Sequence, residues 1–165
     1  MNTKEAWALV GGLSKPSKMP GWSIGIPAKE CKTGAKLRLI PDSVCYKCYA
    51  LKGCYVFQVV QAAQYKRLEA ISHPDWVQAM TTLINSKKPD VFRWHDSGDV
   101  QDEAHLNKIF EVCRATPSKR HWMPTRPDGQ YHQRSRLDHH QRSRWAETQG
   151  QSHHPHHRET GPVRQ

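Results

Sequence analysis

Apolar residues follow two periodicities along the chain, and the change between them marks the predicted elements. Short apolar and aromatic runs, each stopping at or just before a turn residue, predict β-strands at residues 22–26, 91–95 and 120–124. Helical spacing of apolar residues predicts helices over residues 55–72, Ser72–Lys88 and 102–116. Residues 1–21 are punctuated by Gly and Pro, and we expect an irregular lead-in there.

Each predicted helix has one apolar stripe that we expect to be buried. The stripes are Phe57, Val60, Leu68 and Ile71 in the first helix, Trp76, Met80, Leu83 and Ile84 in the second, and Leu106, Ile109, Phe110 and Cys113 in the third. Strands that alternate with helices in this order form mainly parallel sheets, so we predict an α/β fold with a partial parallel sheet. Loops that follow such strands share the carboxyl edge of the sheet, where ligands bind.

The chain changes character after Arg126. Residues 127–165 contain no Lys and few aliphatic residues, whereas Arg and His are frequent. A segment of this composition cannot build a core, so we predict one α/β domain over residues 1–126 and a disordered tail over residues 127–165. The histidines at 139–140 and within 153–157 could bind a transition metal weakly, but a solvated tail is the better interpretation because no scaffold fixes them.

Four of the five cysteines lie in one short polar stretch, at Cys31, Cys45, Cys48 and Cys54. Cys45 and Cys48 form a CxxC, a spacing that lets two thiolates bind one metal centre. An iron–sulfur cluster is the interpretation that the pattern favours most. Structural zinc held by all four cysteines is the second, although zinc sites commonly have two such CxxC pairs. A redox CxxC and buried apolar cysteines are the remaining alternatives. Cys113, on an apolar helix face, is expected in the core.

A second polar group follows the strand predicted at residues 91–95 and consists of His95, Asp96, Ser97, Gly98 and Asp99. These residue types form ordinary turns, but two acids and a histidine at the end of an apolar strand favour a functional group that contacts a cofactor or a metal. Arg126, just past the third predicted strand, would reach the same edge and bind a carboxylate or phosphate. Because both loops follow strands, we expect them to form one site.

The net charge of +10 favours anionic partners such as nucleic acid or a phosphate-bearing cofactor. Dispersed Lys and Arg that keep a protein soluble are the simpler interpretation. There is neither an apolar run long enough for a membrane span nor a signal-peptide core, so we expect a cytoplasmic protein without a membrane partner. In that reducing compartment, clustered cysteines more often bind metals or take part in catalysis than form disulfides.

The stretches CKTGAKL, SVCYKCYALKGCY, FRWHDSGDVQ and WMPTR follow one another over about residues 20–126. On these stretches the chain resembles the phage gene product eighty-eight family, a family of unknown function. The resemblance implies a protein of the bacterial host cell with shared thiols at Cys31, Cys45 and Cys48, and with Cys54 as an extra. The motifs stop at Arg126, which suggests a frameshift or gene truncation near residue 127 and an inactive remnant.

That family is in turn distantly similar to radical S-adenosylmethionine enzymes. The similarity implies an incomplete βα barrel and a [4Fe-4S] cluster on Cys31, Cys45 and Cys48. It also implies S-adenosylmethionine contacts at Ser97, Gly98 and Asp99, with His95 and Asp96 beside them. Two features depart from the pattern of those enzymes. Thirteen residues separate Cys31 from Cys45 where the enzymes have CxxxCxxC, and SGD replaces their GGE turn.

The leading hypothesis is therefore a phage-derived iron–sulfur protein, related to radical S-adenosylmethionine enzymes, that acts on an unknown substrate. The alternative is a zinc-stabilised nucleic-acid-binding module in which all four clustered cysteines are structural and the basic surface binds phosphates. The residues alone leave open whether the chain is an enzyme.

Overall fold

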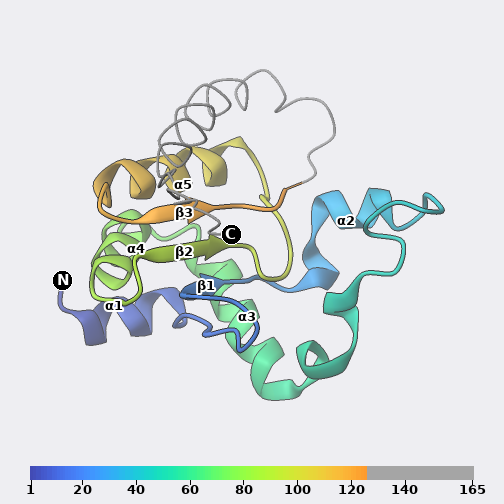
Figure 1. Ribbon diagram of the computed structural model, residues 1–165, viewed down its shortest axis with the longest axis horizontal. Coiled ribbons are helices and arrows are strands. Elements are labelled where there is room, and N and C mark those ends of the chain that lie inside the picture. The colour runs from blue at the N-terminus through green and yellow to red at the C-terminus, as the bar shows by residue number, and fades with distance from the viewer. Residues whose placement is uncertain (126–165) are drawn as a thin grey trace, which may run out of the picture. The chain divides into compact units, whose positions relative to one another are not determined.

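A three-stranded parallel sheet with helices on one side forms the framework of the protein (Figure 1). The computed structural model describes residues 1–125 of the chain. The strands, in spatial order, are β1 (Trp22–Ile24), β2 (Val91–Trp94) and β3 (Arg120–Trp122). All three predicted strands are present, each one or two residues shorter than expected, and the predicted parallel sheet is confirmed. Within residues 1–125 the sheet is open and forms no barrel.

The three predicted helices are present as α3 (Gln58–Ala70), α4 (Trp76–Asn85) and α5 (Glu103–Ala115). Two further helices, α1 (Thr3–Val10) and α2 (Lys32–Leu37), were not expected. The prediction of an irregular lead-in is wrong over α1 because Asn2 and Glu5 form a reciprocal capping box and Gly11 ends the helix in the left-handed conformation. None of the described helices is long and apolar enough to cross a membrane.

The core lies between the sheet and the helices behind it. Phe92 and Trp94 alternate on one face of β2, and the ring of Trp94 lies 6.2 Å from that of Trp76 in α4. The whole predicted stripe of α4 is buried. This face of the sheet is therefore buried against the helices.

The predicted stripe of α3 is wrong. Its buried face is Gln64, Arg67 and Ala70, whereas Phe57 at its N-terminal end is 60% exposed. Gln64 and Arg67 are buried because they donate hydrogen bonds to the Ser97 hydroxyl and the Gly11 carbonyl oxygen, respectively. Buried polar groups are tolerated when they are paired in this way.

The stripe of α5 is displaced from its predicted position. Leu106 and Ile109 are buried as expected, together with Val112 and His105. Cys113, expected in the core, is only half-buried. The buried face runs through His105, Leu106, Ile109 and Val112, which leaves Cys113 at its edge, and the His105 ring packs 5.7 Å from that of Trp76.

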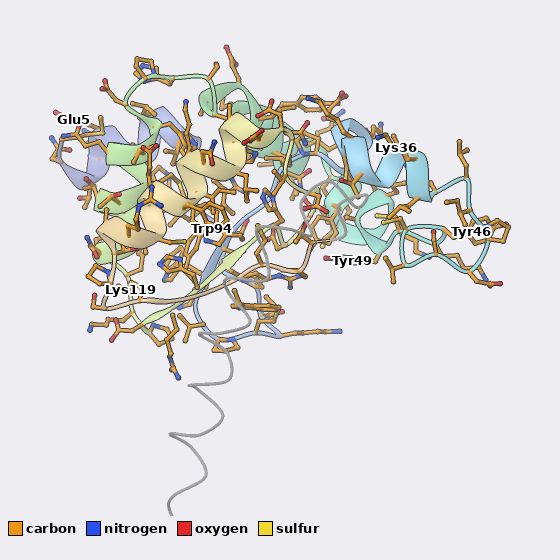
Figure 2. All side chains as sticks on the ribbon, turned by 90° about the horizontal axis from the view of Figure 1, so that it is seen from above. Glu5, Lys36, Tyr46, Tyr49, Trp94 and Lys119 are labelled. Carbon is orange, nitrogen blue, oxygen red and sulfur yellow. The ribbon has the colours of Figure 1, made fainter. Side chains whose placement is uncertain are left out.

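The opposite face of the sheet carries the side chains that alternate with the core residues, namely Ser23, Arg93 and Trp122. The guanidinium carbon of Arg93 lies 4.8 Å from the centre of the Trp122 ring. Figure 2 shows the described helices on the other side of the strands, so no helix of residues 1–125 covers this face. Arg126 and the tail predicted over residues 127–165, with its histidine clusters, lie outside the described residues.

The two faces predict unequal effects of removing a tryptophan. Trp94 is 1% exposed and Trp122 is 39% exposed. Trp94→Ala should lower the free energy of unfolding by about 3–5 kcal/mol, because it empties a packed core. Trp122→Ala should cost about 1 kcal/mol or less, since it removes a partly exposed cation–π contact. Urea unfolding of both variants checks this, and equal losses would show that the sheet is covered on both faces.

Candidate functional site

The turn after β2 is fixed to the carboxyl end of β1 by backbone hydrogen bonds. Asp96 N–H donates to the Ile24 carbonyl at 3.3 Å, and Ile26 N–H donates to the Ser97 carbonyl at 3.1 Å. Gly25 lies so close to the turn that a Cβ atom there would collide with Asp96 Oδ1. Residue 25 must therefore be glycine so that this segment and the turn after β2 can approach each other.

His95 begins the turn in an unusual backbone conformation, with φ of 57°. Its side chain is buried, its ring lies 5.4 Å from the ring of His105, and neither ring nitrogen has a hydrogen-bond partner among the described residues. Burial lowers the pKa of His95 to about 4, and the nearby Arg93 lowers it as well. His95 is therefore neutral at pH 7 and supports the turn from within the core.

Asp96 is the carboxylate at the centre of the turn. Its Oδ2 accepts a hydrogen bond of 2.9 Å from the Ser23 hydroxyl. Its Oδ1 is buried and has no hydrogen-bond partner within residues 1–125. A buried carboxylate oxygen without a partner costs free energy, and a cationic or hydrogen-bond-donating ligand would remove that cost.

Ser97, Gly98 and Asp99 complete the turn and are held by protein contacts. The Ser97 hydroxyl donates to the Ile26 carbonyl at 2.7 Å, and Gly98, at φ of 74°, is packed against Ile26. Asp99 Oδ1 accepts from Val100 N–H and from the Thr125 hydroxyl, each at 2.7 Å. Ser97 and Gly98 thus fix the shape of the turn, and their predicted contact with a cofactor stays a prediction.

Cys31 is the buried member of the clustered cysteines and lies beside this turn. Burial raises the pKa of its thiol, a hydrogen bond from Gly34 N–H lowers it, and the charges of Asp99, Cys45 and Cys48 raise it further. Cys31 is thus within electrostatic range of Asp99 and of both cysteines of the CxxC.

The other clustered cysteines are less enclosed. Cys45 and Cys48 are half-buried and are joined by a turn in which Cys48 N–H donates to the Cys45 carbonyl at 3.2 Å. Cys54 is exposed. None of the five cysteines, all of which lie within the described residues, forms a disulfide. The CxxC does not open an α-helix after a strand, so the arrangement differs from that of redox CxxC proteins.

Two tyrosines attach the cysteine segment, residues 31–57, to the turn. Tyr49 and Tyr55 both donate hydrogen bonds to the carbonyl oxygen of Asp96, at 2.5 Å and 3.3 Å, and their rings make an edge contact at 5.6 Å. Burial, Asp96 and Tyr49 raise the pKa of Tyr55 to about 12, so it stays a donor at any physiological pH. Figure 2 shows Tyr49 on the side of the segment that is nearer to the strands.

Sequence reasoning missed both tyrosines as site residues. The available signal was a repeat, because each of Cys45, Cys48 and Cys54 is followed directly by a tyrosine. Residues that follow ligands in sequence are well placed to orient them from outside.

The side chains do not converge on a single ion. Among residues 1–125, no group of three or more His, Cys, Asp or Glu side chains is arranged so that it could hold a metal ion. The thiols of Cys31, Cys45 and Cys48 are near enough to interact electrostatically but do not form a closed mononuclear site.

The buried histidines predict a loss of stability in acid. Burial lowers the pKa of His105 to about 3 and that of His95 to about 4, below the ordinary value of 6.5. Between pH 6.5 and these values the unfolded chain binds protons that the folded chain does not. Stability should therefore be full above pH 6.5 and fall as pH drops, by up to about 1.4 kcal/mol per pH unit for each histidine.

Urea unfolding between pH 7 and pH 4 measures this dependence. The His105→Gln variant should show a shallower slope than the parent. His73→Gln, in which an exposed histidine is changed, should keep the parent slope. An unchanged slope in the His105 variant would contradict the account.

The tyrosine contacts predict local rather than global loosening. A Tyr49→Phe/Tyr55→Phe variant loses both bonds to the Asp96 carbonyl but keeps its rings. Hydrogen exchange across residues 45–57 should become faster, while the strands keep their protection, because the contacts join a segment to a separate core. Tyr46→Phe is the control, since no described residue bonds to its hydroxyl. Unchanged exchange in the double variant would show that other contacts hold the segment.

Comparison with known proteins supports part of the sequence-based resemblance. The family model described as Gene product 88, a phage family, matches residues 2–155. The match begins before and ends after residues 20–126, so the likeness does not stop at Arg126 as the motifs suggested. The frameshift near residue 127 stays a hypothesis. No curated protein and no solved structure matches the chain, and the comparisons show no similarity to radical S-adenosylmethionine enzymes. The chain belongs to the Gene product 88 family.

Proposed function

We propose that the protein binds a metal centre through the thiolates of Cys31, Cys45 and Cys48, and that this centre is an iron–sulfur cluster. The observation that carries the proposal is the position of Cys31. Its thiol is buried and lies within electrostatic range of the half-buried Cys45 and Cys48 and of Asp99. Thiolates from a short CxxC and one distant cysteine are a usual ligand set for such clusters.

The protonation of Cys31 supports a ligand rather than a reactive thiol. Nucleophilic and redox cysteines have a lowered pKa and lie in electropositive surroundings. The pKa of Cys31 is raised by burial, and its neighbours Asp99, Cys45 and Cys48 would repel a thiolate. A bound metal replaces the thiol proton and removes that repulsion.

The packing of the cysteine segment also supports a metal. Leu39 is 82% exposed, Val44 is 64% exposed and Phe57 is 60% exposed, so the segment buries few of its own apolar side chains. A segment without an apolar core usually depends on a metal, a disulfide or a partner for its order. No disulfide is present within the described residues, which favours one of the other two.

The exposure of Cys54 favours a three-thiolate cluster over zinc held by four cysteines. Cys45 and Cys48 lie within electrostatic range of the buried Cys31, whereas Cys54 is exposed. When bound, such a cluster supplies electron transfer and, with three protein ligands, one iron that is open to a small molecule.

A role for S-adenosylmethionine rests on the family resemblance and on Asp96. The buried Oδ1 of Asp96, which has no hydrogen-bond partner within residues 1–125, is the kind of acceptor that the ammonium group of this cofactor requires. Ser97 and Gly98 would serve by holding Asp96 in place, since their own contacts are to Ile26.

The rival is a zinc-stabilised nucleic-acid-binding module held by all four clustered cysteines. The two models differ over Cys54. The zinc model requires Cys54 as a ligand, so Cys54→Ser should unfold the segment. The cluster model uses three thiolates, so the same change should have little effect.

Anaerobic reconstitution with iron and sulfide tests the proposal. The parent protein and Cys54→Ser should both take up iron and sulfide and develop visible charge-transfer absorbance. Cys31→Ser, Cys45→Ser and Cys48→Ser should each lose most of it, because three ligands are the minimum set. Cys113→Ser, with a half-buried cysteine in α5, is the control and should behave like the parent. The proposal fails if the parent retains zinc tightly and takes up no cluster, or if Cys54→Ser loses the cluster as fully as Cys31→Ser.

A further inference from the structure

Within residues 1–125, the excess of positive charge is concentrated in residues 15–57, which contain the four clustered cysteines. Residues 15–57 carry eight Lys and Arg residues and two acids, Glu30 and Asp42. Residues 58–125 carry nine Lys and Arg residues and eight Asp and Glu residues. Charge that is clustered in this way is the footprint of an anionic partner, whereas dispersed charge only keeps a protein soluble.

Exposed large hydrophobic side chains are also concentrated in residues 15–57. They are Leu39, Ile40, Val44, Tyr46, Tyr49, Val56 and Phe57. Large apolar side chains that remain exposed together mark an interaction surface. The partner of this surface is therefore both anionic and able to contact apolar or aromatic groups.

The exposed aromatic rings continue from the cysteine segment onto the face of the sheet that no helix of residues 1–125 covers. Tyr46 is 48% exposed, Tyr49 is 54% exposed and Trp122 is 39% exposed. Arg93 joins the last two, because it lies 4.8 Å over the Trp122 ring and donates to the Tyr49 hydroxyl at 3.4 Å. Figure 2 shows Tyr46 at the outer end of the segment and Tyr49 between it and the strands.

We propose that Tyr46, Lys47, Tyr49, Arg93 and Trp122 form a basic-aromatic surface that binds single-stranded nucleic acid. Unpaired bases stack on exposed aromatic rings, and cations between the rings pair with the phosphates. A duplex hides its base faces, so single strands should bind more tightly. An anionic membrane fits less well, because membrane-surface binding uses a long amphipathic helix and α2 has six residues. The proposal does not depend on which metal the cysteines hold.

Fluorescence anisotropy of the full chain with a labelled oligothymidylate of about 20 nucleotides tests the proposal, with a duplex of the same length as comparator. Tyr46→Ala and Trp122→Ala should each weaken binding by about 5-fold to 150-fold, the range expected for one stacked base. Tyr65→Ala, with a ring 42% exposed on α3, is the matched control and should bind like the parent.

The phosphate contacts are tested by salt dependence. Lys52 is a second exposed lysine of the cysteine segment, three residues after Tyr49. Lys47→Ser/Lys52→Ser should therefore reduce the slope of log K against log salt by about 1.4, which is about 0.7 for each lost phosphate contact on a single strand. Lys4→Ser/Lys66→Ser removes the same charge from the exposed surfaces of α1 and α3, and should leave the slope near that of the parent.

Three results would overturn the proposal. The first is an absence of binding by folded parent protein. The second is equal weakening in the test and control variants, which would assign binding to residues outside this surface. The third is displacement of the oligonucleotide by anionic phosphatidylserine vesicles at lower concentration than by unlabelled strand, which would make the surface a membrane site. Iron content, measured on the same samples, shows separately whether the metal proposal holds.

Discussion

The carbonyl oxygen of Asp96 is the point on which the candidate site depends, because both tyrosines of the cysteine segment donate to it. It is available to them because His95 adopts a positive φ and carries the turn across the end of β1. A non-glycine residue in that conformation costs about 1–3 kcal/mol. Packing of the neutral His95 ring against His105, in a core that excludes water, helps to offset this cost.

The sheet could be predicted from the sequence because its strands are separate apolar runs whose order implies parallel pairing. Helix α4 could also be predicted from the sequence, since its buried stripe is apolar throughout. Helix α3 was not, because the positions that it buries are Gln64 and Arg67. Their partners lie 33 and 56 residues away, so no local pattern could indicate them. The missed helix α1 was different, since its capping box was present in the sequence.

The meeting of the two halves of the site was also predictable, because both loops leave the carboxyl ends of neighbouring strands. Cys31 is buried and Cys54 is exposed, and which of the thiols are ligands stays a prediction. The separate roles within the turn were not predictable. The Ser97 hydroxyl donates to the Ile26 carbonyl and Gly98 packs against Ile26, whereas Asp96 keeps a side-chain oxygen without a partner within residues 1–125. Only the fold decides which polar groups are satisfied by the protein and which are left for a ligand.

The proposed metal centre and the proposed nucleic-acid surface are physically linked. The rings and cations of that surface lie largely on the segment that buries few of its own apolar side chains. Holding such a segment in one conformation costs conformational entropy, and a partner that must order it on binding loses that free energy from its affinity. A metal on Cys31, Cys45 and Cys48 would restrain Tyr46 and Lys47 directly, because both residues lie inside the CxxC. A bound metal would already have ordered the segment, so nucleic acid would lose less conformational entropy on binding. The metal and the nucleic acid should therefore bind with positive coupling.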